Sequence, residues 1–263
     1  MGETVRFTSV YGPVTSWRYG RSLGIDPIGS TSTCSFNCVY CQLGSIERLQ
    51  LNRQIFIPTS RVLEDLREFD GNEIDCITLS GSGEPTLALN LGEILQDVKN
   101  LMRKPLIVLT NGTLLHDPEV RRELSLADKV AVKLDAPDSE RLRRVNRPAG
   151  AIDLENILQG IEAFRKDYRG ELAIQTMLLT DWDENARKEY INLLKRLQPS
   201  EIQLNTPTRP KPVQRQLDGR GNHSPEETRP YAVQKLKCVS REVLQSLGAE
   251  IERLSSLRVR YAP

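Results

Sequence analysis

The sequence predicts an α/β fold, namely a partial, open (β/α)6 barrel with an N-terminal extension and a C-terminal cover. Two observations carry this prediction. With 263 residues, 38% of them apolar and 27% charged, the chain can bury one sizeable core. From Cys76 onward, short β-rich runs alternate with amphipathic helical patterns, which is the rhythm of parallel βα units.

The expected strands are short apolar runs of the kind that parallel sheets bury on both faces. They are residues 23–27, 76–79, 106–109, 130–134, 172–177 and 202–205. Amphipathic helices are expected at residues 59–69, 91–102, 118–124, 153–168 and 184–197. Several of these begin with a residue suited to cap a helix, such as Ser60, Asp117 or Asp153.

Two segments fall outside this rhythm. We expect residues 1–205 to form the barrel, with residues 1–22 as an N-terminal extension, and residues 206–263 to cover its open side. The cover begins with a proline-rich stretch, 206–212, that can form neither a helix nor an inner strand because proline lacks the backbone donor. A helix is expected later in the cover, at residues 240–255.

Composition and charge restrict the location and the partners. Lys and Arg total 36 against 35 Asp and Glu, so no overall cationic field marks a general binder of nucleic acid. No run approaches the roughly 18 apolar residues of a membrane span, and the start, Met1 to Arg6, lacks the pattern of a secretory signal. We expect a cytoplasmic protein with no membrane partner, and a monomer is favoured.

The cysteines indicate a metal site. Cys34, Cys38 and Cys41 form a CxxxCxxC loop, and five cysteines in all are a poor plan for disulfides. Thiolates are the usual ligands of iron-sulfur clusters, and three of them leave one iron of a 4Fe-4S cube open. The alternative is structural zinc, which needs four closed ligands. The other candidate ligands are far away in sequence: Cys76, Cys238, His116 and His223.

The loop resembles the signature of the radical S-adenosylmethionine superfamily, in which an aromatic residue, here Tyr40, precedes the third cysteine. The resemblance implies a barrel of the radical SAM type and one 4Fe-4S cluster on Cys34, Cys38 and Cys41. Its open iron chelates S-adenosylmethionine, which is reductively cleaved to a 5'-deoxyadenosyl radical and methionine. A reductant such as flavodoxin or ferredoxin is implied as a partner, and Tyr40 is counted among the cofactor-binding residues.

The second strand ends in a glycine-rich turn that looks like the Gly-Gly-Glu segment of that superfamily. It reads Ser80-Gly81-Ser82-Gly83-Glu84, with a serine between the glycines. Gly83 permits close approach of the backbone to a ligand, and Glu84 is expected to accept a hydrogen bond from the ammonium group of the cofactor. The alternative interpretation is an ordinary glycine turn.

Polar residues follow or interrupt the later strands, where chemistry gathers in parallel sheets. We expect Asn111 and Asp135 to bind the cofactor or substrate, Asp135 also through a ribose hydroxyl or a transferred proton, although either side chain could cap a turn. Gln175 and Asn205 interrupt apolar strands and are expected to bind the cofactor from the barrel lumen. Lys133 fits the lumen or an outward ion pair equally well.

Phrases along the whole chain resemble a prokaryotic group related to wyosine-base (4-demethylwyosine) synthases, which modify a guanosine in tRNA. The phrases include Tyr11-Gly12-Pro13-Val14, Leu134-Asp135-Ala136-Pro137 and Asn146-Arg147-Pro148. No cysteine precedes Cys34, so the second cluster of the archaeal synthases is not expected. The favoured function is therefore radical modification of a tRNA or nucleoside.

Local groups of cations and one cysteine add further candidates. Residues 17–21 mix tryptophan, tyrosine and arginine, and the tail after residue 205 is rich in arginine and lysine. Such mixtures suit phosphate contact and base stacking, and equally a solvated surface. Cys238 lies close to lysines that favour its thiolate, which makes it a candidate hydrogen donor or redox partner, or an idle cysteine.

Two other functions stay open at this stage. The first is a radical enzyme that modifies a peptide, a protein or a small metabolite, or that activates a partner enzyme. The second is a non-catalytic iron-sulfur protein that transfers electrons. Cleavage of S-adenosylmethionine would exclude the second. A tail that orders only around RNA, together with co-purifying tRNA, would separate the favoured function from the first.

Overall fold

The computed structural model describes residues 7–69, 71–150, 152–221 and 228–262. Its main sheet has eight strands in the order β1-β2-β5-β6-β7-β8-β9-β12. Their bounds are β1 Val10–Ser16, β2 Gly20–Ile25, β5 Cys76–Leu79, β6 Leu106–Thr110, β7 Lys129–Lys133, β8 Glu171–Met177, β9 Glu201–Asn205 and β12 Val259–Tyr261. β1 is antiparallel to β2, and the other neighbouring pairs are parallel.

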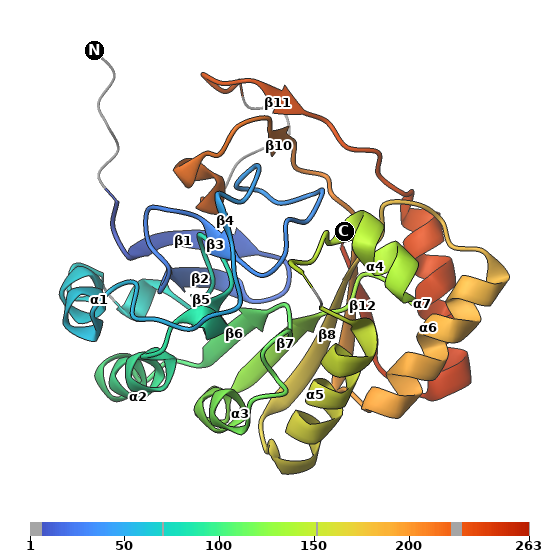
Figure 1. The fold of residues 1–263 in the computed structure, drawn as a ribbon, viewed down its shortest axis with the longest axis horizontal. Coiled ribbons are helices and arrows are strands. Elements are labelled where there is room, and N and C mark those ends of the chain that lie inside the picture. Colours follow the sequence, from blue (N-terminus) through green and yellow to red (C-terminus); the bar gives the residue numbers. More distant parts are fainter. Residues whose placement is uncertain (1–6, 70, 151, 222–227, 263) are drawn as a thin grey trace.

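Figure 1 shows the helices along one side of the curved sheet and two short strand pairs on the other side. The helices are α1 Thr59–Leu66, α2 Leu91–Met102, α3 Pro118–Leu124, α4 Ser139–Val145, α5 Leu154–Asp167, α6 Glu184–Leu197 and α7 Arg241–Ser255. The short strands are β3 Thr33–Cys34, β4 Arg48–Leu49, β10 Lys211–Pro212 and β11 Val233–Gln234, and the short 3-10 turns are Gly71–Glu73, Pro85–Leu87 and Leu217–Arg220. The expected α/β fold, an open partial barrel, is confirmed.

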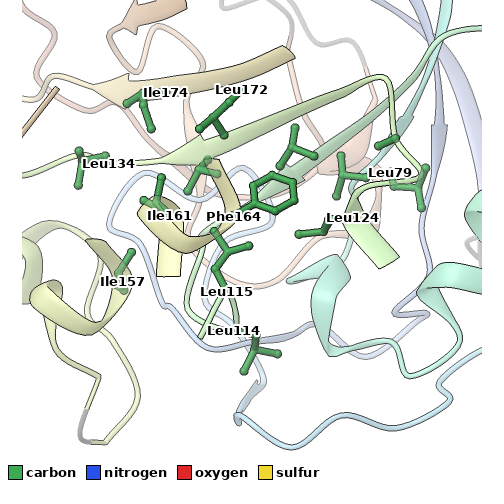
Figure 2. Close-up of a cluster of buried hydrophobic side chains, with 14 of the residues drawn as sticks. Leu79, Leu114, Leu115, Leu124, Leu134, Ile157, Ile161, Phe164, Leu172 and Ile174 are labelled. Carbon is green, nitrogen blue, oxygen red and sulfur yellow. The ribbon is translucent and has the colours of Figure 1, made fainter. Parts of the chain in front are cut away.

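The core lies between the helices and the outer face of the sheet. β5 is buried along its whole length, as an inner parallel strand must be. In Figure 2, Ile161 and Phe164 of α5 lie in one apolar cluster with Leu172 and Ile174 of β8. Burial of such side chains contributes roughly 1.5–3 kcal/mol each, so the core orients the strands and with them the strand ends.

Aspartates cap most of the helices that follow the strands. Asp117 and Asp153 accept hydrogen bonds from the amides of Glu119 and Glu155, as predicted. The prediction for Ser60 was wrong, because α1 begins one residue earlier and no side chain caps its first turn. There Pro58 stands before the first turn, and its ring already sets the backbone angle that the helix entry needs.

The sheet includes more of the chain than expected. Within the predicted extension, Val10–Ser16 forms β1 and pairs with β2. Within the predicted cover, α7 packs on α6, and β12 pairs with β9, so this part extends the barrel and does not cover it. A strand of three residues carries too little periodicity to be recognised in the sequence. The division of the chain at residue 205 stays a prediction.

Candidate active site

Three cysteines line one cavity at the carboxyl ends of the strands. Cys34 ends β3, and Cys38 and Cys41 follow in a tight loop in which the amide of Cys41 donates to the carbonyl of Cys38 at 3.1 Å. The cavity, here called the cysteine cavity, has a volume of about 290 Å³. Its lining includes Gly83 and none of the carboxylates among the described residues.

The glycine-rich turn after β5 holds the start of the cysteine loop. The amide of Glu84 donates to the carbonyl of Thr33 at 3.1 Å, and the amide of Thr33 donates to the carbonyl of Ser82 at 3.0 Å. A Cβ atom on Gly83 would lie 1.6 Å from the oxygen of Thr33. The glycine is therefore required by the close approach of the cysteine loop itself, whereas the sequence analysis assigned it to the approach of a ligand.

A second segment, Asn146-Arg147-Pro148, holds the other side of the loop. The amide of Asn37 donates to the carbonyl of Asn146 at 3.0 Å, and the amide of Val39 donates to that of Val145 at 2.9 Å. The side-chain amide of Asn146 also reaches Cys38 Sγ at 3.4 Å. Sequence reasoning missed Asn146 as a site residue, although the phrase that contains it was part of the family resemblance.

Glu84 and Asn111 connect the strand ends to this frame. One carboxylate oxygen of Glu84 accepts from the hydroxyl of Thr110 at 2.6 Å, and the other accepts from the amide of Asn111 at 2.7 Å. The side chain of Asn111 donates to Ser35 Oγ at 2.7 Å and reaches Cys34 Sγ at 3.6 Å. Both residues therefore stand beside the cysteine loop, with most of their hydrogen-bonding capacity used by the protein.

Asp135 is buried at the end of β7 and has protein partners on both oxygens. Tyr40 donates its hydroxyl hydrogen to Asp135, and Asn146 donates to the same oxygen at 2.6 Å. The other oxygen accepts from the amide of Met177 at 2.7 Å and pairs with Lys133 Nζ at 3.1 Å. Lys133 thus pairs with Asp135 and points toward the site. The hydroxyl of Tyr40 is held by Asp135, which follows β7. The binding and catalytic roles of Tyr40, Gly83, Glu84, Asn111 and Asp135 stay predictions.

The thiols fit a cluster better than a single ion. Burial raises the pKa of all three thiols, that of Cys38 to about 12 with a contribution from Asp135. Thiolates at this site therefore need bound cations as neighbours. Among the described residues, no three Cys, His, Asp or Glu side chains converge on one metal position. Cysteines spread around one cavity match the ligands of separate irons, so Cys34, Cys38 and Cys41 would hold a 4Fe-4S cluster.

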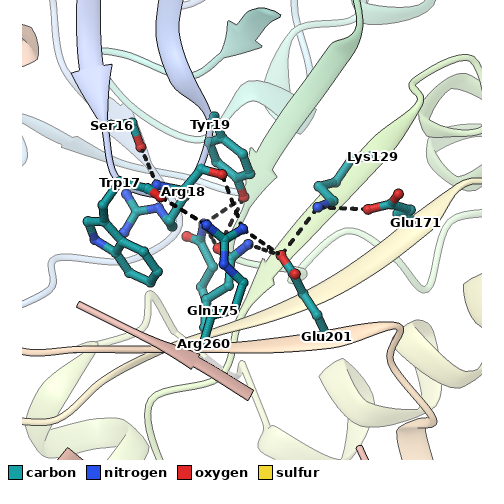
Figure 3. Close-up of polar contacts among 10 residues, drawn as sticks. Ser16, Trp17, Arg18, Tyr19, Lys129, Glu171, Gln175, Glu201 and Arg260 are labelled. Atoms are coloured by element: carbon teal, nitrogen blue, oxygen red, sulfur yellow. Dashed lines mark hydrogen bonds and ion pairs between the residues drawn. The ribbon is translucent and has the colours of Figure 1, made fainter. Parts of the chain in front are cut away.

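A polar layer crosses the barrel below the strand ends. Gln175 donates to Tyr19 at 3.1 Å and to Gln203 at 2.8 Å, and the layer continues to Glu201 and Lys129, which pair at 3.2 Å (Figure 3). This layer supplies the polar partners that Gln175 was predicted to need in an apolar strand. Its role in cofactor binding stays a prediction.

A second cavity, here called the turn cavity, adjoins the cysteine cavity. It measures about 320 Å³ and is lined by Trp17, Arg18, Asn205 and Arg209 among others. Gln42 and Arg209 line both cavities. Among the described residues, no Asp or Glu lines either of them, nor a smaller cavity of about 110 Å³ that Arg18 also lines. Asn205 lines the turn cavity and its role in cofactor binding stays a prediction, whereas Arg18 and Arg209 were noted only as part of charged segments.

The remaining candidates lie elsewhere. Cys76 is buried in β5, and its thiol lies 3.4 Å from the carbonyl oxygen of Tyr19. Cys238 is exposed, and its thiol lies 3.3 Å from the carbonyl oxygen of Pro207. His223 and the start from Met1 to Arg6 lie outside the described residues.

Comparison with known proteins identifies the class. The model of the Radical SAM superfamily matches residues 28–194, which is more than half of the chain and includes all three cysteines of the loop. The chain belongs to the Radical SAM superfamily. It is 58% identical to the UPF0026 protein slr1464 of Synechocystis sp. over 98% of this chain and 97% of that protein. It is 28% identical to a probable GTP 3',8-cyclase of Saccharolobus islandicus over 56% of this chain and 45% of that protein.

A solved structure shares the fold. SuiB of Streptococcus suis, bound to the precursor peptide SuiA, has a TM-score of 0.64 at 13% identity, with 91% of this chain and 48% of SuiB covered. SuiB bound to S-adenosylmethionine has a TM-score of 0.59 at 13% identity and covers 92% of this chain and 47% of SuiB. The chain thus spans about half the length of SuiB, and the likeness shows the fold alone.

Membership settles the class of chemistry. The protein is an enzyme, and its cofactors are a 4Fe-4S cluster and S-adenosylmethionine. When bound, the reduced cluster supplies the electron that cleaves S-adenosylmethionine to a 5'-deoxyadenosyl radical. The chain's own residues place the cysteine loop and shape the neighbouring cavities. In the part of the chain that the structure describes, every helix is too short or too polar to cross a membrane.

Proposed function

We propose that the protein starts radical chemistry on an RNA or a nucleoside, with tRNA as the favoured substrate. The observation that carries the proposal is the charge of the cavities around the cysteine loop. Arg18, Arg209 and Arg220 are their charged lining residues apart from the cysteines. Arg220 is paired with the carboxylate of Asp26 at 2.8 Å, whereas no carboxylate among the described residues forms an ion pair with Arg18, so Arg18 is the cation that attracts an anion.

The other lining groups suit a nucleobase. Trp17 offers an aromatic face of the kind on which unstacked bases are held, and Asn205 and Gln42 offer side-chain amides for base edges. The related cyclase is named for a guanosine nucleotide, and the wyosine synthases that the sequence resembles modify a guanosine. Both likenesses support the proposal that the protein belongs to a group related to those synthases.

The proposed roles follow the cavities. Cys34, Cys38 and Cys41 hold the single cluster, and the strand ends beside the loop bind S-adenosylmethionine. The residues proposed for cofactor binding are Tyr40, Gly83, Glu84, Asn111, Asp135, Gln175 and Asn205. Asp135 receives or gives a proton, and Cys238 donates hydrogen from beside Pro207, which lines the turn cavity.

The remaining proposals concern its setting. The electron comes from a small carrier such as flavodoxin or ferredoxin, because the superfamily needs a reductant. We propose that the protein is a cytoplasmic monomer that binds tRNA in its folded state. We also propose that residues 206–221 and 228–234 cover the mouth of the barrel. A contact of Gln42 supports this arrangement, because its side-chain amide donates to the backbone carbonyl of Arg209 at 3.4 Å.

One assay tests the function. The protein is reconstituted anaerobically with iron and sulfide, reduced with dithionite, and given S-adenosylmethionine with or without a tRNA pool. We expect 5'-deoxyadenosine to increase with tRNA, and a digest of that tRNA to contain a nucleoside of changed mass. Cleavage that tRNA leaves unchanged, with no altered nucleoside, contradicts the proposal and directs the search to peptides and metabolites.

A further inference from the structure

Arg18 occupies an unusual position in the turn between β1 and β2. Its guanidinium lies 5.3 Å from the ring centre of Trp17 and 5.9 Å from that of Tyr19. Its Nε is buried and has no hydrogen-bond partner. Among the described residues, no carboxylate forms an ion pair with it. Because a buried donor without a partner costs free energy, this side chain is poised to bind an acceptor from outside the chain.

The turn that carries Arg18 is held in place from the far edge of the sheet. Arg260 of β12 donates to the carbonyl of Trp17 at 2.9 Å and to that of Arg18 at 3.3 Å, and its guanidinium lies 5.6 Å from the Trp17 ring centre (Figure 3). The backbone amide of Arg18 donates to Ser16 Oγ at 3.2 Å. Such a fixed turn orients the guanidinium before a ligand arrives, which lowers the entropic cost of binding.

The charges around Arg18 favour an anion between them. Arg209 lines the same cavity, and Arg260 lies behind the turn. Burial lowers the pKa of Arg18, and the charges of Arg209 and Arg260 lower it further against the opposite effect of Tyr19. The repulsion is relieved when an anion binds, and a guanidinium matches the geometry of phosphate oxygens.

We infer that Arg18 binds a phosphate group of the substrate in the turn cavity, with the base stacked on Trp17. The inference rests on the proposed function and narrows its substrate class: the enzyme acts on a phosphorylated nucleotide, alone or within RNA, and discriminates against the free nucleoside. The carboxylate of S-adenosylmethionine is the other anion that such a guanidinium could hold, so the experiment must separate the two.

Trp17 is a probe for this site. The chain has two tryptophans, and the other, Trp182, is buried against Tyr190. In a Trp182→Phe background, fluorescence therefore reports on the turn cavity without any cluster or turnover. The ligands are the four nucleoside 5'-monophosphates and the matching nucleosides. We expect the monophosphates to change the fluorescence and to bind at least about tenfold more tightly than the nucleosides.

Matched variants assign the effect to Arg18. Arg18→Gln is expected to weaken monophosphate binding about tenfold or more, and Arg18→Lys to weaken it less. Arg21→Gln removes the same charge from an exposed side chain that pairs with Glu73, and should leave binding unchanged. Circular dichroism melting of each variant checks that the fold is kept, and equilibrium dialysis of the reconstituted protein measures binding of S-adenosylmethionine.

The inference is overturned if nucleosides and monophosphates bind equally, or if Arg18→Gln and Arg21→Gln behave alike. It is also overturned if Arg18→Gln weakens only the binding of S-adenosylmethionine, because Arg18 then belongs to the cofactor site. Loss of monophosphate binding in Arg18→Gln supports it even when the tRNA pool stays unmodified. In that case the phosphate site stands, and the proposal of tRNA as substrate fails.

Discussion

The buried carboxylates beside the cysteine cavity and Arg18 in the turn cavity differ in their hydrogen-bond partners. Beside the cysteine cavity, both oxygens of Asp135 and of Glu84 accept hydrogen bonds from protein donors. In the turn cavity, Arg18 keeps a buried nitrogen without a partner, close to the like charge of Arg209. The carboxylates are therefore part of a frame, whereas Arg18 is available for a ligand.

This difference separates two kinds of buried polar group within one site. Satisfied buried networks stiffen a structure and hold it in one arrangement. A buried cation with a donor left without a partner costs free energy, and an anionic ligand would offset that cost. The cysteine loop is thus positioned by the protein, whereas we propose that a ligand supplies the missing acceptor in the turn cavity.

The largest expected effect comes from removing a cluster ligand. Cys38→Ala leaves two thiols on the loop, and we expect cluster iron and 5'-deoxyadenosine formation both to fall to background. Iron analysis and chromatography measure the two quantities. Cys76→Ala, which removes a buried thiol outside the cavity, should retain both. Undiminished cleavage in Cys38→Ala would sink the assignment of the loop.

Asp135 tests whether the frame is structural. Asp135→Ala leaves Lys133 without its ion pair, and Tyr40 and Asn146 without their acceptor. We expect the free energy of unfolding of the apoprotein to fall by roughly 3 kcal/mol in urea titrations, because breaking a buried pair strands a charge. Glu140→Ala is the control.

Glu140 forms an exposed pair with Arg144 on α4. Its removal should cost less than about 0.5 kcal/mol. Equal losses in Asp135→Ala and Glu140→Ala would show that the buried network adds no stability.

A variant of Arg260 tests whether the turn that carries Arg18 must be held in place for substrate binding. Arg260→Ala removes both hydrogen bonds that hold the backbone of the turn. We expect KM for RNA to rise about five- to tenfold with little change in kcat, because each hydrogen bond contributes roughly 1 kcal/mol to placing the turn. Arg258→Ala, an exposed cation two residues away, controls for charge. A fall in kcat with KM unchanged would assign Arg260 to the chemical step.

The smallest effect concerns the potential of the cluster. Asn146 Nδ2 reaches Cys38 Sγ at 3.4 Å, and such contacts stabilise the more negative, reduced state. Asn146→Ala should therefore make the midpoint potential more negative by roughly 20–60 mV, the equivalent of one hydrogen bond in a one-electron couple. A redox titration followed by electron paramagnetic resonance measures it. Asn100→Ala, on the outer face of α2, should leave the potential unchanged.

The periodicity of apolar residues within a segment predicted most of the helices and strands well. The predicted helices 91–102, 118–124 and 184–197 have these bounds in the structure, and the predicted strands from β5 to β9 agree within one residue at each end. The first predicted strand, 23–27, agrees less well, because β2 is Gly20–Ile25. Their apolar periodicity is set by burial against the sheet, which the residues of each element record by themselves. The CxxxCxxC loop is equally local, so its spacing was enough to propose the three cysteines as metal ligands.

The sequence by itself therefore determined the βα architecture, the cysteine loop and the class of chemistry that the loop supports. Only the tertiary structure decided that Tyr40 and Asn146 meet on Asp135, that β12 closes the far edge of the sheet, and that Arg18 keeps an unpaired nitrogen in the turn cavity. These contacts join residues far apart in the chain. Their partners follow from strand order and register, and no short stretch of sequence contains that information.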